Sequence, residues 1–479
     1  MKVLFITLGC KVNQYETEAI RERFEAAGYL SAEEGEEVDA VIINSCTVTA
    51  ESDRKTRQLC RKYRRLCPTA AIVLIGCMAQ AFPEEAEALD CVDVILGNRD
   101  AGMVLQKTEE YLSDRVRIVE VSPHDRTERF NTPGIGRFEE RTRAFMKIED
   151  GCQRYCTYCI IPTARGVVRS RPAADIRAEA ARLALAGYRE IVLVGINLSA
   201  YGRDTGERLC DAVSAVCSVE GISRVRLGSL EPDQITDDDL ARLAAEEKFC
   251  PQFHLSLQSG CDATLKRMNR HYDTAFYTDL VTRIRRAFSN PSVTTDVMVG
   301  FPGEREEDFL ASAEYVKGIG FARSHVFAYS RRAGTRAAVM PDQIPKKEKA
   351  RRASLMSAAA KEAADRFHEG QVGCVVQVLF EQFADGLLSG YSENYTHVLT
   401  PGDKSLCGRI CPVEITGVLA DGCTGRLLRE GERTPLSRKQ HIKTQSAFLQ
   451  EYCEKGALVI FVKMQCFGCQ STAFFAVIP

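Results

Sequence analysis

Three cysteines stand close together in the nine-residue segment GCQRYCTYC, residues 151 to 159. Cys152, Cys156 and Cys159 have the spacing C-x3-C-x2-C, and the chain continues as Ile-Ile-Pro without a fourth cysteine nearby. Three thiolates can bind three irons of a 4Fe-4S cluster and leave the fourth iron open. Zinc is the alternative, but it usually takes four ligands from two paired motifs, and no second pair lies near. The spacing therefore predicts an iron–sulfur site whose open iron can bind a small molecule.

A second set of three cysteines follows three apolar runs near the start of the chain. The runs are short and β-branched, as buried parallel strands are, and comprise Val3–Leu8, Val38–Ile43 and Ile72–Ile75. Cys10, Cys46 and Cys77 come just after them. In open α/β sheets, ligands bind at the carboxyl ends of the strands. Three buried thiols in turns are the alternative, but the repeated position favours a second cluster site.

The elements around these cysteines predict two α/β domains. Helical patterns such as Thr17–Ala27 and Pro83–Leu89 alternate with the apolar runs, which indicates a doubly wound parallel sheet over residues 1 to 122. Residues 123 to 142 are polar, contain two prolines and two glycines, and are predicted to be a linker. Residues 143 to 370 hold six further strand patterns with helical patterns between them, which suits an open, partial (β/α)6 barrel.

Polar residues and glycines stand where the predicted barrel strands end. Any one of them, taken alone, is better explained by a helix cap or a loop. As a group they suit a bound zwitterion, because glycine allows close backbone approach and carboxylates accept hydrogen bonds from ammonium or hydroxyl groups. These strand-end residues are Gly195, Asn197, Glu231, Ser256, Gln258, Asp296 and Gly300.

The spacing of Cys152, Cys156 and Cys159, with Tyr158 before the third cysteine, resembles the signature of the radical S-adenosylmethionine (SAM) enzymes. The resemblance implies that the open iron binds SAM and that one electron from the cluster releases a 5′-deoxyadenosyl radical. It also implies that Tyr158 and the strand-end residues contact SAM.

The segments GCKVNQYE, INSCTVT and IGCMAQ resemble the N-terminal domain of the methylthiotransferases, a branch of the same enzymes. GCKVNQYE and CTVT are similar to the bacterial MtaB type, which acts on threonylcarbamoyladenosine in tRNA. The resemblance implies two 4Fe-4S clusters and two SAM molecules. One SAM would methylate a sulfur on the auxiliary cluster of Cys10, Cys46 and Cys77. The other would yield the radical that removes hydrogen from carbon 2 of adenine at position 37. No catalytic side chain beyond the cluster ligands is implied.

Residues 371 to 435 change to short strands divided by turns, which predicts a small all-β barrel. GYSENYTHV resembles the RNA-binding TRAM domain. Tyr391, Tyr395 and His397 would present rings to bases or fill the barrel core. The resemblance stops near residue 436. The extension from 436 to 479 has no assigned role, and its Cys466 and Cys469 form a lone C-x2-C, which is weak evidence for a metal.

Basic residues are the remaining candidates for RNA contact. The segment Arg54–Arg65 holds seven basic residues of twelve and no acid, which suits either a phosphate-contacting helix or a solvated helix face. Further candidates, for contact with RNA or with the substrate, lie in segments that resemble the family: Lys266, Arg267, Arg270, Arg331 and Arg336.

The overall composition limits the number of domains, the mode of RNA binding and the expected location of the protein. A chain of 479 residues exceeds one hydrophobic core, so several domains are expected. The net charge of −2 means that RNA must be bound by local patches. The 20 cysteines are spread over a long chain and are expected to be reduced, in the cytoplasm. No apolar run has the length of a membrane span.

The expected partners are tRNA and a reductant protein such as flavodoxin or ferredoxin, with no membrane and a monomeric chain. Two alternatives of the same chemistry use isopentenyladenosine in tRNA or a ribosomal-protein aspartate as substrate. A third alternative is a non-catalytic iron–sulfur protein that binds RNA or senses redox state.

Overall fold

The computed structural model describes residues 1–138 and 142–428, and the backbone of two strands at 459–463 and 473–477. The chain forms two compact units. The first holds Met1–Gly370 together with Tyr391–Thr396, and the second holds Gln371–Gly390 and the described residues from His397 onward. The first unit carries both cysteine trios.

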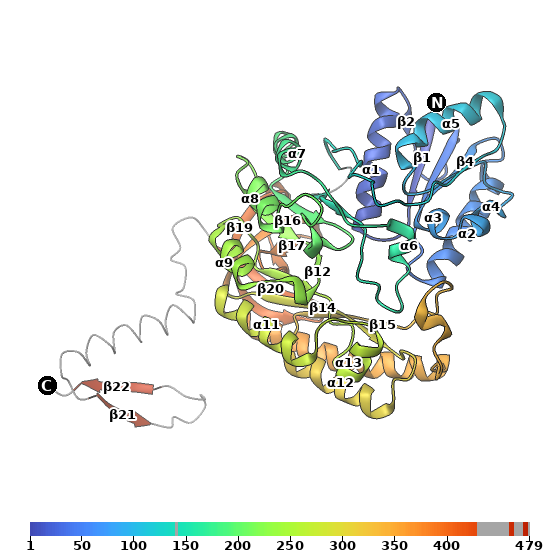
Figure 1. Ribbon diagram of the computed structural model, residues 1–479. Helices are drawn as coiled ribbons and strands as arrows, with labels where there is room; N and C mark the ends of the chain where they lie inside the picture. Colours follow the sequence, from blue (N-terminus) through green and yellow to red (C-terminus); the bar gives the residue numbers. More distant parts are fainter. Residues whose placement is uncertain (139–141, 429–458, 464–472, 478–479) are drawn as a thin grey trace. The chain divides into compact units, whose positions relative to one another are not determined.

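The first unit begins with a six-stranded parallel sheet (Figure 1). Its strand order is β2-β1-β3-β4-β5-β6. The strands are β1 (Lys2–Thr7), β2 (Leu30–Ser31), β3 (Ala40–Ser45), β4 (Ala71–Gly76), β5 (Val94–Leu96) and β6 (Ile118–Glu120). Because β1, β3 and β4 are neighbours and parallel, their carboxyl ends meet at one stretch of the sheet edge.

Helices cover both faces of this sheet, because alternate residues of its strands point to opposite sides. On one face Val41, Ile43, Ile72 and Leu74 pack with Cys60 of α2. On the other face Ala40, Ile42, Ala71 and Val73 pack with Ile20 and Phe24 of α1 and with Val104 of α5. The helices of this region are α1 (Lys11–Ala26), α2 (Ala50–Leu66), α3 (Cys77–Ala81), α4 (Pro83–Glu87) and α5 (Val104–Asp114).

The second part of the first unit is an open barrel of parallel strands in chain order. They form two sheets, β11-β10-β7 and β12-β13-β14-β15. The strands are β7 (Arg143–Lys147), β10 (Glu190–Val194), β11 (Arg224–Leu227), β12 (Ser229–Leu230), β13 (Gln252–Leu255), β14 (Ser292–Val299) and β15 (Arg323–Ala328). The run predicted as one strand from Arg224 is divided into β11 and β12 at Gly228.

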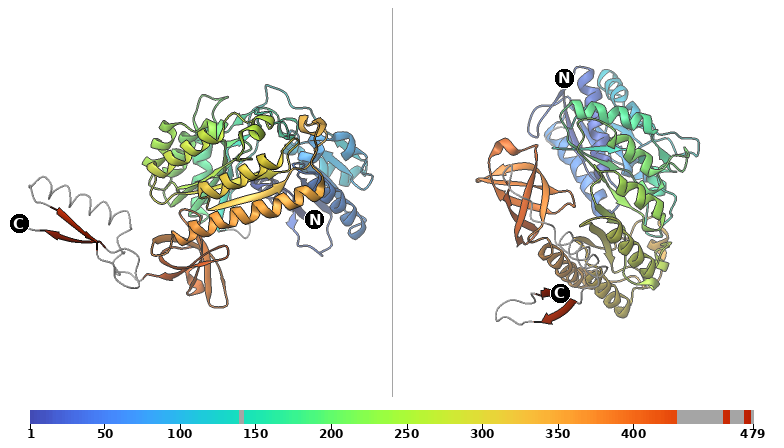
Figure 2. Two further views of the ribbon diagram at one scale, coloured as in Figure 1. Left: turned by 90° about the horizontal axis from the view of Figure 1, so that it is seen from below. Right: turned by 90° about the vertical axis from the view of Figure 1, so that its left-hand side faces the viewer.

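The barrel helices follow the strands, and the long helix α13 lies alongside α12 (Figures 1 and 2). They are α7 (Ala173–Leu185), α8 (Leu209–Cys217), α9 (Asp237–Ala245), α11 (Thr274–Ala287), α12 (Glu306–Ile319) and α13 (Lys346–Glu369). The short helices α6 (Ile161–Arg165) and α10 (Asp262–Arg267) lie in the loops, and the short strands β8 (Glu149–Asp150) and β9 (Arg169–Ser170) pair with each other.

Helix α1 joins the sheet domain to the barrel, because its residues Val12, Tyr15 and Ala19 belong to the main barrel core. A second joint is polar. Arg332, which follows β15, donates to Asp53 of α2 over 2.6 Å and to Thr47 over 2.6 Å. Both charged side chains are almost fully buried. The two parts of the first unit are therefore held together by apolar packing and by a desolvated ion pair.

The second unit contains a closed five-stranded barrel with its own core, in which Val376, Val378, Phe380, Leu388 and Val413 pack together. The strand order is β16-β17-β18-β20-β19. The strands are β16 (Val375–Ala384), β17 (Leu387–Ser392), β18 (His397–Pro401), β19 (Ile410–Leu419) and β20 (Gly422–Leu427). Beyond it, β21 (Val459–Lys463) and β22 (Ala473–Val477) pair antiparallel. Cys466 and Cys469 lie outside the described residues.

The predicted fold class is confirmed: a parallel α/β sheet domain, an open radical SAM type barrel and a small all-β barrel. Helix boundaries differ from the sequence prediction, since α1 begins at Lys11 and not at Thr17. The reason is that Val12 and Tyr15, in the first turns of the helix, are buried against the barrel, a distant contact that the local pattern does not reveal. Among the helices described, none has the length and apolar composition needed to cross a membrane.

Replacing Asp53 by Ala is expected to destabilise the first unit by about 3–5 kcal/mol, because the Arg332 guanidinium would stay buried without its partner. Thermal or denaturant unfolding measures the change. Glu362→Ala, which removes the exposed partner of Arg366, is the matched control and should leave the midpoint almost unchanged. Equal, small shifts for both variants would contradict the assigned role of the buried pair.

Candidate active site

The first cysteine trio lies at the edge of the N-terminal sheet. Cys10 follows β1, Cys46 follows β3 and Cys77 begins α3 directly after β4. Gly9 has a φ of +113°, and a Cβ there would lie 2.8 Å from Cβ of Cys46. The chain therefore needs glycine at position 9 to bring Cys10 beside Cys46. The structure brings together the three cysteines that the sequence placed at equivalent strand ends.

Polar side chains surround this trio. Asn13 accepts a hydrogen bond from the Cys10 thiol over 3.3 Å and another from Arg165 over 3.1 Å. Nε of Arg165 lies 3.3 Å from Sγ of Cys77, and Nδ2 of Asn98 lies 3.5 Å from the same sulfur. Arg165 is fully buried. The cation of Arg165 and the amide donor of Asn98 would stabilise a metal-bound thiolate of Cys77.

Burial raises the pKa of Cys46 to about 11, and the neighbouring thiols of Cys77 and Cys10 contribute to the shift. The three sulfurs thus lie close enough to oppose one another's ionisation. Thiols in this state lose their protons when a metal binds them, so the metal itself must supply the compensating charge.

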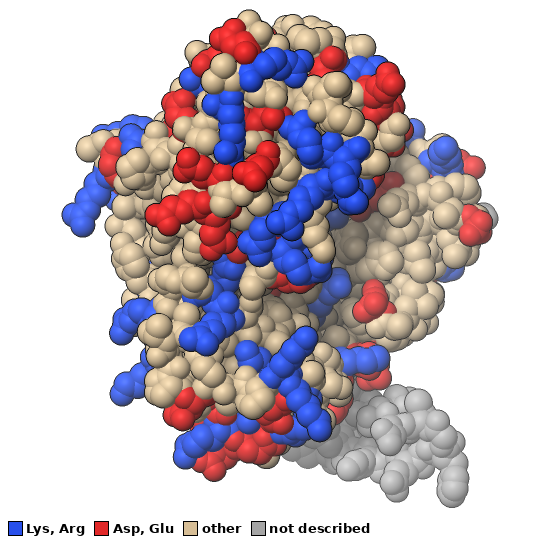
Figure 3. Space-filling view, turned by 90° about the vertical axis from the view of Figure 1, so that its right-hand side faces the viewer, with Lys and Arg blue, Asp and Glu red and all other residues tan. Residues whose placement is uncertain are grey.

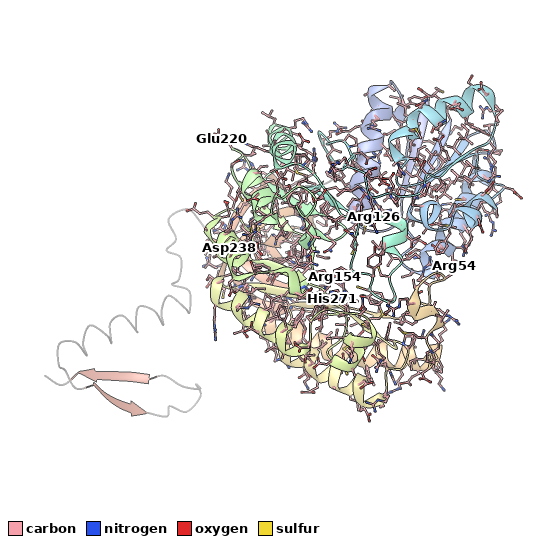
Figure 4. The ribbon with its side chains drawn as sticks, in the orientation of Figure 1. Arg54, Arg126, Arg154, Glu220, Asp238 and His271 are labelled. Atoms are coloured by element: carbon pink, nitrogen blue, oxygen red, sulfur yellow. The ribbon has the colours of Figure 1, made fainter. Side chains whose placement is uncertain are left out.

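The second trio lies on the loop between β8 and α6. Gly151 opens this loop with a φ of +89°, and a Cβ there would meet the carbonyl oxygen of Val167 at 1.9 Å. The backbone N–H of Cys159 donates to the carbonyl of Cys156 over 3.0 Å. Arg154 from the same loop, labelled in Figure 4, pairs with Asp233 over 2.7 Å. These contacts fix the loop that presents the three thiols.

Arg270 lies against this second trio. Its Nη1 is 3.2 Å from Sγ of Cys156, and its Nη2 pairs with Glu231 over 2.6 Å. Burial raises the pKa of Cys152 to about 12, with the thiol of Cys156 adding to the shift. Each trio therefore has one buried arginine in contact with one of its sulfurs.

No group of three or more His, Cys, Asp or Glu side chains in the described residues is arranged to hold a single metal ion. A cubane is compatible with the arrangement, because each thiolate binds a different iron and the sulfurs need not converge on one point.

A cavity of about 490 Å³ connects the sheet edge to the interior of the barrel. Cys10 and its neighbours line one side, and residues from every one of the barrel strands β7 and β10 to β15 line the other. Of the predicted SAM-contacting residues, Gly195 and Asp296 line this cavity. A substrate in this space would touch both domains of the first unit.

The other predicted SAM-contacting residues fall into two groups. Asn197 and Gln258 are buried, and their side-chain oxygens Oδ1 and Oε1 have no hydrogen-bond partner among the described residues. Such orphaned acceptors fit a ligand with ammonium or hydroxyl donors. The remaining residues have partners within the fold. Tyr158 packs edge-on against Phe301, Glu231 pairs with Arg270, the Ser256 carbonyl accepts from Arg270, and Gly300 donates to Glu304.

Glu149 was not among the residues predicted from the sequence. It is fully buried and lies in β8, directly before the cluster loop. Its Oε2 accepts from the backbone N–H of Asn197 over 2.7 Å, while Oε1 has no partner among the described residues. A Cβ at Gly195 would lie 2.6 Å from Oε2. An acid two residues before the glycine of the cluster loop was the available signal. Glu149 completes, with Asn197 and Gln258, a set of three orphaned acceptors.

The candidates for RNA or substrate contact have different surroundings in the structure. Arg270 is buried against Cys156, so it is not a surface contact for RNA. Arg267 pairs with Asp308 over 3.0 Å and Arg331 donates to the carbonyl of Ala338 over 2.7 Å. A run of basic residues in the sequence does not reveal such partners, which come from other segments of the chain.

The tyrosines predicted to stack on bases are stacked on each other. The rings of Tyr391 and Tyr395 are 4.6 Å apart, and the guanidinium of Arg143 lies 4.8 Å from the Tyr391 ring. All three belong to the first unit. His397, in the second unit, hydrogen-bonds through Nε2 to Ser389 over 2.8 Å. The two tyrosines therefore lie outside the core of the small barrel, and their contact with bases stays a prediction.

The basic segment Arg54–Arg65 forms most of α2. Arg54 and Arg57 pair with Glu51 and Glu85, and Lys62 and Arg64 pair with Glu34 and Asp93. The face of the molecule in Figure 3 likewise mixes Lys and Arg with Asp and Glu. Four of the seven basic residues thus have acidic partners, which favours a solvated, ion-paired helix face over a free phosphate-binding stripe.

Two family models match the chain. Uncharacterized protein family UPF0004 covers residues 2–97, and the Radical SAM superfamily covers residues 146–316. The threonylcarbamoyladenosine tRNA methylthiotransferase MtaB of Bacillus subtilis is 38% identical over 420 residues, which are 86% of this chain and 93% of that protein. The protein of the same name from Thermotoga maritima is 37% identical, over 81% of this chain and 89% of that protein.

A second kind of relative is the tRNA-2-methylthio-N(6)-dimethylallyladenosine synthase of Pelotomaculum thermopropionicum, 32% identical over 89% of this chain and 97% of that protein. Among solved structures, the radical SAM methyltransferase TsrM of Kitasatospora setae has a TM-score of 0.54 at 13% identity, over 71% of this chain and 75% of that one. That likeness concerns the fold alone.

The stability of the folded protein should depend on pH through the Glu149 carboxyl. Burial raises its pKa well above 4.5, with the Asn197 N–H opposing the shift and Asp150 adding to it. The folded protein therefore binds more protons than the unfolded chain above pH 4.5, so its stability should fall as the pH rises from 4.5 through the folded-state pKa. Glu149→Gln keeps the shape and removes this loss. Thermal melts of cluster-free protein between pH 4.5 and 8 should show that the melting temperature of the variant rises relative to that of the wild type as the pH rises. The exposed Glu220→Gln (Figure 4) is the control, and parallel profiles for all three proteins would contradict the prediction.

Proposed function

Because the chain belongs to the radical SAM methylthiotransferases, we propose that it adds a methylthio group to carbon 2 of N6-threonylcarbamoyladenosine at position 37 of tRNA. The observation that carries the proposal is the cavity that joins Cys10, at the edge of the N-terminal sheet, to the strand ends of the barrel. The sequence supports the same substrate, since four relatives named for that nucleoside are 36% to 38% identical over most of the chain.

Enzymes of this family bind two 4Fe-4S clusters and SAM. We assign the auxiliary cluster to Cys10, Cys46 and Cys77, and the radical SAM cluster to Cys152, Cys156 and Cys159. Each set offers three thiols, which leaves one iron open for a ligand. When bound, the reduced radical SAM cluster supplies the electron for cleavage of SAM, and the auxiliary cluster supplies sulfur.

The side chains of this protein hold and orient the reactants. Glu149, Asn197 and Gln258 offer unpaired acceptors to the ammonium and hydroxyl groups of SAM. Arg165 and Arg270 place one positive charge beside each set of thiolates and so stabilise the ionised ligands. The shared cavity brings the sulfur source and the base into proximity.

The partner is tRNA. A small reductant protein such as flavodoxin or ferredoxin would deliver the electrons, and the chain would act as a monomer. The same chemistry on dimethylallyladenosine in tRNA is the alternative that the second kind of relative suggests. A non-catalytic iron–sulfur protein is the alternative of another class.

The test is anaerobic turnover of the reconstituted protein with SAM, a reductant and tRNA bearing threonylcarbamoyladenosine. The expected result is a methylthiolated nucleoside on digestion and mass spectrometry, together with 5′-deoxyadenosine. Cleavage of SAM without that product, but with product from dimethylallyladenosine tRNA, would contradict the substrate. Absence of SAM cleavage with both clusters loaded would favour the non-catalytic alternative.

Mutations in the two cysteine sets should affect different activities. Cys156→Ala should abolish formation of 5′-deoxyadenosine, because the radical SAM cluster would lose a ligand. Cys46→Ala should abolish methylthio transfer and still cleave SAM. Cys217→Ala, a buried cysteine in α8 away from both sets, is the matched control and should retain both activities. Loss of SAM cleavage in Cys46→Ala with wild-type radical SAM cluster content would overturn the division of roles.

A further inference from the structure

The cavity that runs from Cys10 into the barrel carries an excess of positive charge. Its lining includes four cationic side chains from four different elements, Lys11, Arg143, Arg226 and Arg323. Among the described lining residues the one carboxylate is that of Asp296. A concave site with low-dielectric walls and one dominant sign of charge attracts ligands of the opposite sign.

Two of these cations are already neutralised. Arg226 pairs with the fully buried Glu190 over 3.0 Å, and Arg143 lies 3.9 Å from the same carboxylate. The Tyr395 ring lies 4.8 Å from the Arg226 guanidinium and 5.2 Å from that of Arg143. These groups form a fixed wall of the cavity and leave little charge for a ligand.

Lys11 and Arg323 differ from this pair. Within the described chain, no carboxylate forms an ion pair with either of them. Lys11 Nζ lies 5.5 Å from the centroid of the Phe145 ring, and Arg323 is the first residue of β15. The Asp296 carboxylate forms no ion pair with Lys11 or Arg323, and it lies 3.3 Å from Nε2 of His254.

The two unpaired cations line the same cavity as His325. Burial lowers the pKa of His325, the carboxylate of Asp296 opposes the shift, and the charges of Arg323 and Lys11 both add to the lowering. Both cations therefore act on the same imidazole, which itself lines the cavity. Lys11 comes from the N-terminal domain and Arg323 from the barrel, so the pair exists only where the two domains meet.

The substrate of the proposed function carries an anion at the matching position. The threonyl part of N6-threonylcarbamoyladenosine ends in a carboxylate. The distal ureido N–H can hydrogen-bond to N1 of adenine, and this places the threonyl group on the ring edge that also bears carbon 2. A base whose carbon 2 faces the Cys10 side of the cavity therefore presents its carboxylate close to the residue that follows Cys10.

We propose that Lys11 and Arg323 bind the carboxylate of the threonylcarbamoyl group and thereby select this nucleoside over one with an apolar dimethylallyl group. The inference rests on the proposed function and names its specificity determinants. A dimethylallyl group would leave both cations desolvated and unpaired, and sites built around polar partners reject analogues that lack the partner.

The test compares binding of two anticodon stem-loops, one with threonylcarbamoyladenosine and one with unmodified adenosine at position 37. Lys11→Gln and Arg323→Gln should each weaken binding of the modified loop by roughly tenfold to a hundredfold and leave the unmodified loop unchanged, because one charge-assisted contact is lost. Lys361→Gln, which removes an exposed charge on α13, is the matched control and should change neither affinity.

A third RNA in which the carboxylate is replaced by a carboxamide tests the same contact from the ligand side. The wild type should bind it as weakly as the variants bind the natural loop, and the double variant should no longer distinguish the two. Lys11 directly follows Cys10, so Lys11→Gln could assemble its clusters poorly, which a measurement of iron content would show. Arg323 is remote in sequence from the cysteines, so in that case Arg323→Gln alone tests the contact with the carboxylate.

Two results would overturn the inference. An equal loss for both loops would make the cations phosphate contacts. A loss of SAM affinity alone would assign them to the carboxylate of SAM, the other anion that enters this cavity. Either result leaves the proposed function intact, provided that the wild type methylthiolates threonylcarbamoyladenosine. Failure of the wild type on that substrate would instead remove the proposed function.

Discussion

The arrangement of the first unit depends on the buried guanidinium of Arg165. It contacts Sγ of Cys77 over 3.3 Å, Asn13 over 3.1 Å and Glu16 over 2.9 Å, all from the N-terminal domain, while Arg165 itself belongs to the loop region after the second cysteine trio. A desolvated charge is costly unless all its donors are satisfied. The satisfied geometry requires both domains in one orientation, so the two cysteine trios are held at a fixed separation although they come from different domains.

A second cation extends this network and makes it cooperative. Nζ of Lys147 donates to Glu16 over 2.7 Å and to Asp150 over 2.6 Å, and Arg165 also reaches Asp150 over 3.4 Å. Burial alone would raise the pKa of Asp150, but the charges of Lys147 and Arg165 outweigh burial and lower it. Removal of any one member would leave an uncompensated charge at the domain boundary, and such boundaries otherwise allow relative motion.

The sequence predicted the cysteine sites because a parallel strand, its carboxyl end and the residue that follows form a local pattern. Cys10, Cys46 and Cys77 could be placed at one edge without knowledge of any distant contact. Arg165 and Arg270 could not, because the sulfurs that they contact are 88 and 114 residues away in sequence. A basic residue looks the same in sequence whether it faces RNA or a thiolate. Glu149 was missed for a related reason, since its burial arises from strands far along the chain.

The polarity of the barrel strands also orders the cavity along its length. Gly195 and Gly228 line it directly after β10 and β11, at the carboxyl ends of these strands. Arg323 lines it as the first residue of β15, at the opposite end of the parallel strands. Glycines at one end suit a zwitterion that needs close backbone approach, whereas the cation at the other end suits an anion. Two different ligands can therefore share one cavity without competing for the same contacts, which a reaction between them requires.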